Sequence, residues 1–547
     1  MPPGVAVQAY ADDTIILVPA PTRSALGDLA SEVLRRVVSW SCTVKVALNC
    51  DKTFCVLFPH GVGGMERVHP TVRLGPAEPS LTFKESLRVL GVIFDRRLTF
   101  FHHAEYLRNK VATLASRVAT FLAMQRSCVR PAHKVLLYRQ VLLPALTYAS
   151  PVWWGESHVD CRLYARMVTI QRVALLALTR AYHTTSTAAL QVLMQAPPID
   201  LELERINTEF RLFTLRRYVA FGSLRYCPDW VANPHSAVAI HPAAPAIVPF
   251  TRLTSAQARA ASRAPAVQVY TDGSFTSTSA GAAIVIFAPP DRVLAVGRYR
   301  LLRATSAYSA EVVAFREALR HLIAARYLEP VALYTDCLSL LQALASQRNV
   351  EPHVLEIRAL VRKLSREVHV YLYHVPGHAG VADFIAERAA HRGIEVSLPL
   401  PFRAVRSQLH RELLVLWTAR WRAEHSRTEL FRWITDLRTL PSYFPPPPSL
   451  VTLLTGHGRF PHYFVRFHLM RAPRCPCGSY CVDMSHVLHA CPITTPYTSR
   501  IAPQDAYRNM CYSLVLACPR NRALLICAVR TYSDRMPHVT ATSLSPP

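Results

Sequence analysis

The chain is short of lysine and of acidic residues. Only six of its 547 residues are lysine, and 36 acidic residues stand against 62 lysines and arginines, so the formal net charge is +26 at pH 7. Almost all of the cations are therefore arginines, whose guanidinium groups bind phosphates in pairs of hydrogen bonds and stack on bases. A GC-rich gene would also favour arginine over lysine, but it would not explain the excess of cations over anions. The charge predicts a polyanionic partner, and nucleic acid is the first candidate.

Long apolar runs are also missing. No run reaches the roughly 18 residues that a bilayer span needs, and residues 1–8 lack the basic region of a secretory signal. Fourteen cysteines in 547 residues do not make a disulfide framework. Hydrophobic residues make up 51% of the chain, which excludes wholesale disorder. We expect an intracellular protein of the nucleus or cytoplasm, not secreted, with reduced thiols and no membrane partner.

Composition and periodicity predict a multidomain chain. A mixed α/β unit with five strands begins abruptly after a segment rich in proline and alanine. The segments that we expect are a short β-rich unit at 1–60, a mostly helical region at 61–221, a linker at 222–266, the α/β domain at 267–391, an arginine-rich helical segment at 392–445, and a cysteine- and histidine-containing segment with a tail at 446–547.

Three carboxylates of the α/β unit are placed at the ends of predicted elements. Asp272 ends the first strand, Glu311 opens a helix and Asp336 ends a later strand. Taken singly, each could cap an element or carry a solvated charge. Together they can converge at one sheet edge, where their repulsion requires divalent cations. Oxygen ligands suit Mg²⁺ or Mn²⁺, and two such ions can hold a phosphodiester and activate water.

Residues 267–391 resemble a type 1 ribonuclease H domain. The matching features are the Thr-Asp-Gly-Ser strand end at 271–274, the Ala-Glu helix start at 310–311, the Thr-Asp strand end at 335–336 and the Gly-His loop at 377–378. That family cuts the RNA strand of RNA–DNA hybrids with two Mg²⁺ ions. The resemblance assigns metal ligation to Asp272, Glu311 and Asp336, and it assigns proton shuttling or product release to His378.

The fourth acidic ligand departs from the family pattern. The helix after the Gly-His loop matches if one loop residue is deleted, and Glu387 then replaces the usual aspartate. Asp383 lies one helical turn earlier on the same face, where it could be the ligand or the helix N-cap. We favour Glu387 as the ligand. A longer side chain on a shortened loop would place the second metal poorly and reduce activity.

The first residues carry a second pair of carboxylates. Asp12 and Asp13 lie between two apolar strands, and such a pair can bind metal or simply form a polar turn. Residues 10–13 resemble the YADD motif of reverse transcriptases. Residues 48–53 resemble a later motif whose lysine, here Lys52, lies near the nucleotide phosphates, and residues 90–95 resemble the segment leading into the thumb of non-LTR retrotransposons. No acid precedes Tyr10 to supply a third carboxylate. We therefore expect a truncated palm and a helical thumb that do not polymerise DNA alone.

A cluster near the C-terminus has the spacing of a metal site. Cys475, Cys477, His486 and Cys491 follow the pattern C-x-C-x8-H-x4-C, which suits tetrahedral, structural zinc. Cys481 and His489 are spare candidates, and buried thiols that merely pack are the alternative. Residues 453–458 and this pattern resemble the C-terminal region of retrotransposon polyproteins, where the family function is nucleic-acid binding. The nearby arginines, which agree with phosphate contacts, are Arg459, Arg466, Arg471 and Arg474.

The order of these features is more specific than any one of them. It indicates the C-terminal part of a non-LTR retrotransposon polyprotein: a truncated palm, a helical thumb, a ribonuclease H-like domain with a mixed five-stranded sheet, and a small zinc-binding segment. We expect Mg²⁺-dependent cleavage of RNA in hybrids, with RNA–DNA hybrid, element RNA and target DNA as partners. The alternative is a catalytically inactive nucleic-acid-binding remnant.

Overall fold

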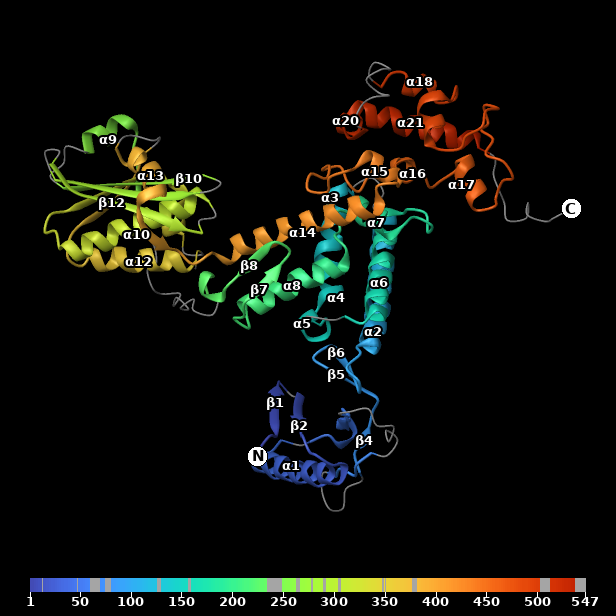
Figure 1. Cartoon of the computed structure of the whole chain (residues 1–547). Helices are drawn as coiled ribbons and strands as arrows, with labels where there is room; N and C mark the ends of the chain where they lie inside the picture. The colour runs from blue at the N-terminus through green and yellow to red at the C-terminus, as the bar shows by residue number, and fades with distance from the viewer. Residues whose placement is uncertain are drawn as a thin grey trace. The chain divides into compact units, whose positions relative to one another are not determined.

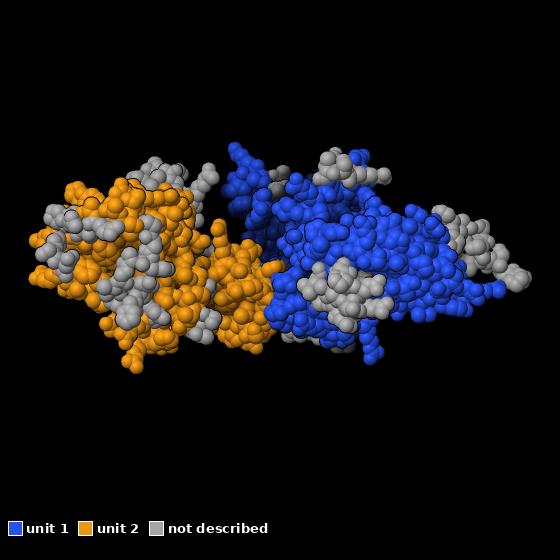
Figure 2. Space-filling view, turned by 90° about the horizontal axis from the view of Figure 1, so that it is seen from above, with its two compact units in different colours: residues 1–206, 414–547 blue, residues 207–413 orange. Residues whose placement is uncertain are grey.

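The computed structural model describes most of the chain. The described residues are 1–11, 13–46, 48–59, 69–73, 80–124, 129–155, 159–233, 248–261, 266–276, 279–288, 292–303, 306–346, 349, 351–375, 381–501 and 512–536. They form two compact units, one of residues 1–206 with 414–547 and one of residues 207–413 (Figure 2). The six segments predicted from sequence are thus grouped into two bodies. None of the described helices has both the length and the apolar character that a bilayer crossing demands.

The unit of residues 207–413 is built on a mixed sheet with the strand order β15-β12-β11-β10-β13-β14-β9. Strands β10, β11 and β12 pair antiparallel and the remaining pairs are parallel. Besides the end of α8 and the start of α14, its elements are β7 (Val219–Phe221), β8 (Leu224–Tyr226), β9 (Thr251–Arg252), α9 (Ser255–Ala261), β10 (Val267–Phe275), β11 (Ala280–Ala288), β12 (Arg292–Leu302), α10 (Ala307–Ala325), β13 (Val331–Thr335), α11 (Leu338–Ala345), α12 (Pro352–Leu364), β14 (Val370–His374), α13 (Val381–Arg392) and β15 (Ile394–Ser397).

Both faces of this sheet are covered, by α10 and α12 on one side and α13 on the other (Figure 1). Alternate residues of β11 explain the arrangement. Ile284 and Ile286 join the core cluster of α10, whereas Ala283 and Val285 pack against Ala386 of α13. A strand buried on both faces is apolar throughout, which accounts for the continuous apolar sequence of residues 282–287.

The prediction of five strands was wrong in number. The sheet has two further strands, β9 and β15, which lie at its two edges. They span only Thr251–Arg252 and Ile394–Ser397, and such short pieces carry too few residues to show a period of two. The segment predicted as a linker also contains β8 and α9, so its described parts are folded against neighbouring elements.

The other unit begins with small β-hairpins and continues as helices. β1 pairs with β2 and β5 with β6, both antiparallel, as the sequence predicted for the front hairpin. Its elements are β1 (Ala6–Tyr10), β2 (Asp13–Leu17), α1 (Arg23–Thr43), β3 (Phe54–Cys55), β4 (Thr82–Phe83), β5 (Ser86–Val89), β6 (Val92–Asp95), α2 (Phe101–Met124), α3 (Pro131–Leu137), α4 (Leu143–Thr147), α5 (Ser150–Trp153), α6 (Cys161–Thr179), α7 (Thr187–Met194), α8 (Ile199–Phe213), α14 (Phe402–His425), α15 (Glu429–Trp433), α16 (Pro448–Thr455), α17 (Pro461–Arg466), α18 (Thr495–Thr498), α20 (Tyr512–Ala517) and α21 (Pro519–Arg535).

The C-terminal residues do not form a core of their own. Cys475, Cys481 and Cys491 belong to one buried cluster with Val192 and Leu193 of α7, and with tryptophans of α14 and α15. Helix α21 packs against α16 and α18 within the same cluster. The cysteine- and histidine-containing segment is therefore part of a core shared with residues from the helical region.

Candidate metal centres

Three carboxylates of the mixed sheet meet at one edge. Asp272 lies in β10, Glu311 in the first turns of α10, and Asp336 follows β13 directly. One oxygen from each carboxylate lies within 4.8 Å of the others. Asp272 and Glu311 are 6% and 7% exposed. Three acids this close, two of them nearly buried, repel one another, so the donor set fits a divalent cation bound by oxygen ligands.

The backbone around Gly273 fixes the position of Glu311. The amide of Gly273 donates a hydrogen bond to Glu311 Oε1 at 2.9 Å. A Cβ at residue 273 would lie 2.4 Å from the backbone nitrogen of Glu311. Only glycine therefore lets α10 approach β10 closely enough for this bond.

We expect Gly273→Ala to disturb the carboxylate cluster, although the substitution adds only one methyl group. The added methyl group meets backbone of α10 rather than a movable side chain. Overpacking of this kind costs roughly 1–3 kcal/mol and shifts the helix, so both thermal stability and divalent-ion binding should fall. Leu328→Ala is the control, since Leu328 is 91% exposed in the same unit and its truncation should change neither property. Equal metal binding by Gly273→Ala and the unaltered chain would contradict this reasoning.

Parallel pairing of β10 with β13 brings Asp272 and Asp336 together. Tyr270 pairs with Tyr334, and the Thr271 hydroxyl donates to the Tyr334 carbonyl at 3.3 Å. Both aspartates lie two residues beyond that pair, at the same end of neighbouring parallel strands. The Cys337 thiol is close by, and burial, with smaller contributions from Glu311 and Asp336, raises its pKa.

The remaining predicted residues of this site fall where side chains are not described. His378 lies outside the described residues, and the side chains of Asp383 and Glu387 are likewise outside them. The backbone of α13 is described, and it approaches the sheet closely, since a Cβ at Gly281 would lie 2.2 Å from the Ala386 carbonyl oxygen. The choice between Asp383 and Glu387 stays a prediction.

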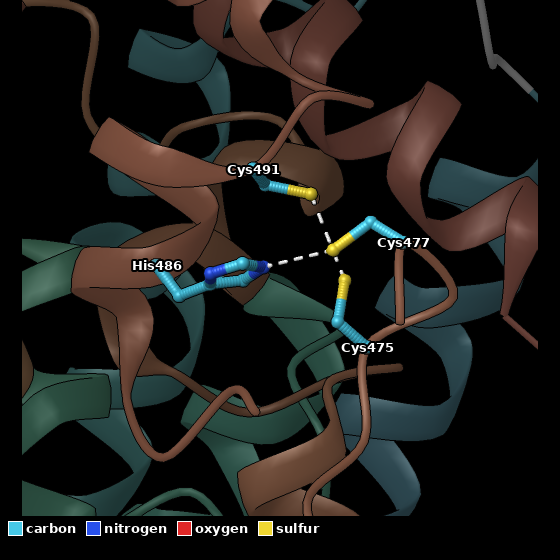
Figure 3. Close-up of side chains that lie close together, drawn as sticks. All are labelled: Cys475, Cys477, His486 and Cys491. Carbon is cyan, nitrogen blue, oxygen red and sulfur yellow. Dashed lines mark hydrogen bonds between the residues drawn. The ribbon is translucent and has the colours of Figure 1, made fainter. Parts of the chain in front are cut away.

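A second cluster unites the four predicted thiol and imidazole groups. Cys475, Cys477, His486 and Cys491 point toward a common centre (Figure 3), with their ligand atoms within 4.8 Å of one another. Cys475 Sγ lies 3.6 Å from Cys491 Sγ, and Cys477 Sγ lies 3.4 Å from His486 Nε2. Tetrahedral zinc with Zn–S of about 2.3 Å and Zn–N of about 2.0 Å gives edges of about 3.8 and 3.5 Å. The donor set therefore fits zinc.

A π-helical turn explains how His486 and Cys491 can reach the same centre with four residues between them. Residues His486–Ala490 form this turn, and the Cys491 amide donates to the His486 carbonyl at 2.8 Å. In an ordinary α-helix, residues five apart would point about 140° away from each other. The wider π-turn brings residues i and i+5 toward one face.

The two spare candidates have other partners. Cys481 is fully buried and its thiol donates to the Asp483 carbonyl, while His489 Nε2 contacts the Tyr512 hydroxyl at 3.0 Å. Burial raises the pKa of Cys481 to about 12. A residue that sequence reasoning missed is Tyr532 of α21, whose hydroxyl donates to Cys475 Sγ at 3.3 Å. Tyr532 is far from Cys475 in the sequence, so no motif links the two residues.

Comparison with known proteins assigns the mixed sheet to a family. The ribonuclease H family matches residues 264–395. The Pol polyproteins of type-1 retrotransposable elements R1 3 and R1 4 of Nasonia vitripennis are 28% identical over 204 residues and 30% identical over 218 residues. These alignments cover 36% and 37% of this chain and 53% and 54% of the relatives. The RNA-directed DNA polymerase from mobile element jockey of Drosophila melanogaster is 26% identical, over 31% of this chain and 18% of the relative.

This chain is a relative of non-LTR retrotransposon Pol polyproteins. It contains a ribonuclease H domain, and it spans about half or less of the length of these three relatives. Among solved structures, ribonuclease H1 of Halobacterium salinarum NRC-1 is 22% identical, with 22% of this chain and 96% of that chain covered and a TM-score of 0.19. The family match of residues 264–395, together with the mixed sheet, confirms the predicted α/β ribonuclease H-like fold for the middle of this Pol relative.

Two of the three residues predicted to belong to a reverse transcriptase remnant are described, and they lie apart in the chain's first elements. Asp12 lies outside the described residues. Asp13 pairs with Tyr10 at the tip of the exposed β1–β2 hairpin, and Lys52 lies in a short 3₁₀ turn. Within the described part of this Pol relative, Asp13 makes no ion pair with Lys52 and joins no metal-binding group. The palm and thumb assignments remain predictions.

Proposed function

We propose that the ribonuclease H domain hydrolyses RNA within RNA–DNA hybrids in an Mg²⁺-dependent, endonucleolytic reaction. The observation that carries this proposal is the convergence of Asp272, Glu311 and Asp336 within 4.8 Å at one sheet edge. The family match of residues 264–395 supports it. Hybrid is the proposed substrate, and element RNA and target DNA are proposed as further nucleic-acid partners.

Each of the three acids would supply ligand oxygens to the divalent ions. When bound, Mg²⁺ or Mn²⁺ supplies Lewis acidity to the phosphodiester and lowers the pKa of the attacking water. Asp272 and Glu311, both nearly buried, supply oxygens whose position is fixed by β10 and by the Gly273 amide. Asp336 is partly exposed and supplies the third carboxylate of the group. We assign the fourth ligand to Glu387 and proton transfer or product release to His378, as the resemblance implies.

The rival function is binding of nucleic acid without cleavage. The shortened loop before Glu387 favours it, whereas the close approach of the three acids favours the enzyme. A labelled hybrid incubated with Mg²⁺, with Mn²⁺ and with EDTA separates the two. The enzyme cuts only the RNA strand and stops in EDTA, while the remnant binds the hybrid and leaves both strands intact.

For the second cluster we propose one structural zinc held by Cys475, Cys477, His486 and Cys491. Four protein ligands leave no open position for a substrate. The sulfur–sulfur and sulfur–nitrogen distances of 3.6 and 3.4 Å support the assignment. Zinc in this position would tie the Cys-Pro-Cys turn to the π-turn and hence to the shared core.

We expect Tyr532→Phe to weaken zinc retention without unfolding the chain. The hydroxyl of Tyr532 donates to Cys475 Sγ at 3.3 Å, and it also lies 4.0 Å from Cys481 Sγ. Groups that donate to metal ligands change metal affinity by about 10- to 100-fold when removed. Competition with a chromogenic chelator measures this change, and Tyr497→Phe, which removes a hydroxyl bonded to Thr531, is the control. Identical zinc affinity of Tyr532→Phe and the unaltered chain would show that the hydroxyl only packs.

A further inference from the structure

The Cys-Pro-Cys turn sits at the tip of a short hairpin, residues 473–481. The Cys475 amide donates to the Ser479 carbonyl at 2.8 Å, the Cys481 amide donates to the Pro473 carbonyl at 2.7 Å, and Arg474 pairs with Tyr480 in an antiparallel bridge. Successive side chains of extended backbone point to opposite faces. Cys475 and Cys481 are 4% and 0% exposed and form the inner face, so Arg474 and Tyr480 form the outer face.

The outer face carries an arginine stacked beside an exposed aromatic ring. Tyr480 is 60% exposed, and Arg474 Cζ lies 5.5 Å from the centre of its ring. The guanidinium group holds the ring through a cation–π contact and leaves most of it open to solvent. A similar pair precedes it, where Arg466 Cζ lies 5.8 Å from the ring centre of Phe467, which is 37% exposed.

The hairpin and the residues that precede it carry only positive charge in the sequence, and the first acid after them is Asp483. Residues 437–482 contain five arginines and no aspartate or glutamate. Two of the five are already engaged, since Arg438 pairs with Asp436 and Arg459 donates to the Met536 carbonyl. The phosphate contact predicted for Arg459 stays a prediction. Arg466, Arg471 and Arg474 are exposed, and none of them forms an ion pair with a described residue.

We propose that Arg474 and Tyr480, the arginine–aromatic surface, bind single-stranded nucleic acid. A base stacks on the Tyr480 ring, while Arg474, together with Arg466 and Arg471, contacts backbone phosphates. Single strands fit this surface because their base faces are free, whereas a duplex buries them in its own stack. The proposal rests on the proposed nucleic-acid partnership of the chain but not on its cleavage chemistry.

The test is fluorescence anisotropy of the full, zinc-loaded chain with short labelled single strands of DNA and of RNA, and with a duplex of the same sequence. Mg²⁺ is left out so that hydrolysis plays no part. Tyr480→Ala should weaken binding of both single strands by about tenfold and leave duplex binding unchanged, whereas Tyr480→Phe should stay within about twofold of the unaltered chain. Tyr218→Ala removes a tyrosine that is 62% exposed in the other unit and should change nothing.

The role of Arg474 is tested by the salt dependence of the binding affinity. Arg474→Gln should lower the slope of log affinity against log salt by about 0.7, as expected for one lost phosphate contact to a single strand. Arg438→Gln, which loses an arginine already paired with Asp436, should leave the slope unchanged.

Three results would overturn the proposal. The first is unaltered single-strand binding by Tyr480→Ala. The second is an equal loss for single strands and duplex, which would indicate charge alone. The third is loss of zinc together with affinity in Tyr480→Ala, which would assign the ring to the fold of the hairpin. Hybrid cleavage measured in parallel keeps the two proposals apart, because a chain that binds single strands but does not cut hybrid contradicts only the ribonuclease assignment.

Discussion

Asp272→Asn should abolish cleavage of RNA in RNA–DNA hybrids while leaving the ribonuclease H domain folded. Asparagine has nearly the shape of aspartate but lacks its negative charge, so it removes a metal ligand from a cluster of three acids within 4.8 Å. The three carboxylates repel each other, and one fewer charge relieves that repulsion. Stability without metal should therefore stay the same or rise. Rate loss of at least about 10³-fold is expected where a bound ion carries the chemistry.

The measurement is gel analysis of a hybrid labelled on its RNA strand, with circular dichroism to check the fold. Glu395→Gln is a matched control. Glu395 is an exposed acid on the edge strand β15, which is separated from β10 by β12 and β11, and it pairs only with Arg300 in the described contacts. Full activity of Asp272→Asn, or cleavage that persists in EDTA, would contradict the assignment of this carboxylate cluster.

Much of the ribonuclease H domain could be predicted because its signals are local. The sequence predicted a mixed α/β unit with five strands, and it placed Asp272, Glu311 and Asp336 at strand ends and at a helix start. Strands β9 and β15 could not be predicted, since two and four residues pair only when a neighbouring edge is already present. The close approach of α10 to Gly273 depends on tertiary packing, and the fold alone identifies the helix involved.

The cluster of Cys475, Cys477, His486 and Cys491 shows the limit of predictions from residue spacing. The four residues were predicted from the pattern alone. His486 and Cys491 face one point because residues 486–490 form a π-turn, and no residue in the segment predicts such a turn. The contact of Tyr532 with Cys475 and the shared core with α7 depend on tertiary packing across distant parts of the sequence. A fragment limited to residues 446–500 would lack both Tyr532 and the α7 residues of this core.

Removal of zinc should disorder the C-terminal core well beyond the metal ligands. Apparent binding energies of about 10–16 kcal/mol for structural zinc equal or exceed the whole stability of a typical domain, about 5–15 kcal/mol. Without the ion, Cys475 and Cys491 remain as buried thiols in the cluster that also contains Val192 and Leu193. We expect the apo chain to melt at a lower temperature and to expose α21 to proteases, while the ribonuclease H domain keeps its protection.

Metal analysis and limited proteolysis of the full chain test this expectation. About one zinc per chain should be bound, and Cys477→Ser and His486→Ala should lose it. Cys481→Ser is the decisive control, since Cys481 is equally buried in the same core but its thiol donates to the Asp483 carbonyl instead of joining the four ligands. Retention of zinc by Cys477→Ser with loss in Cys481→Ser would reverse the ligand assignment. A chain that binds no zinc would leave the cysteines as packing residues, and the core would then have to be stable through its apolar contacts alone.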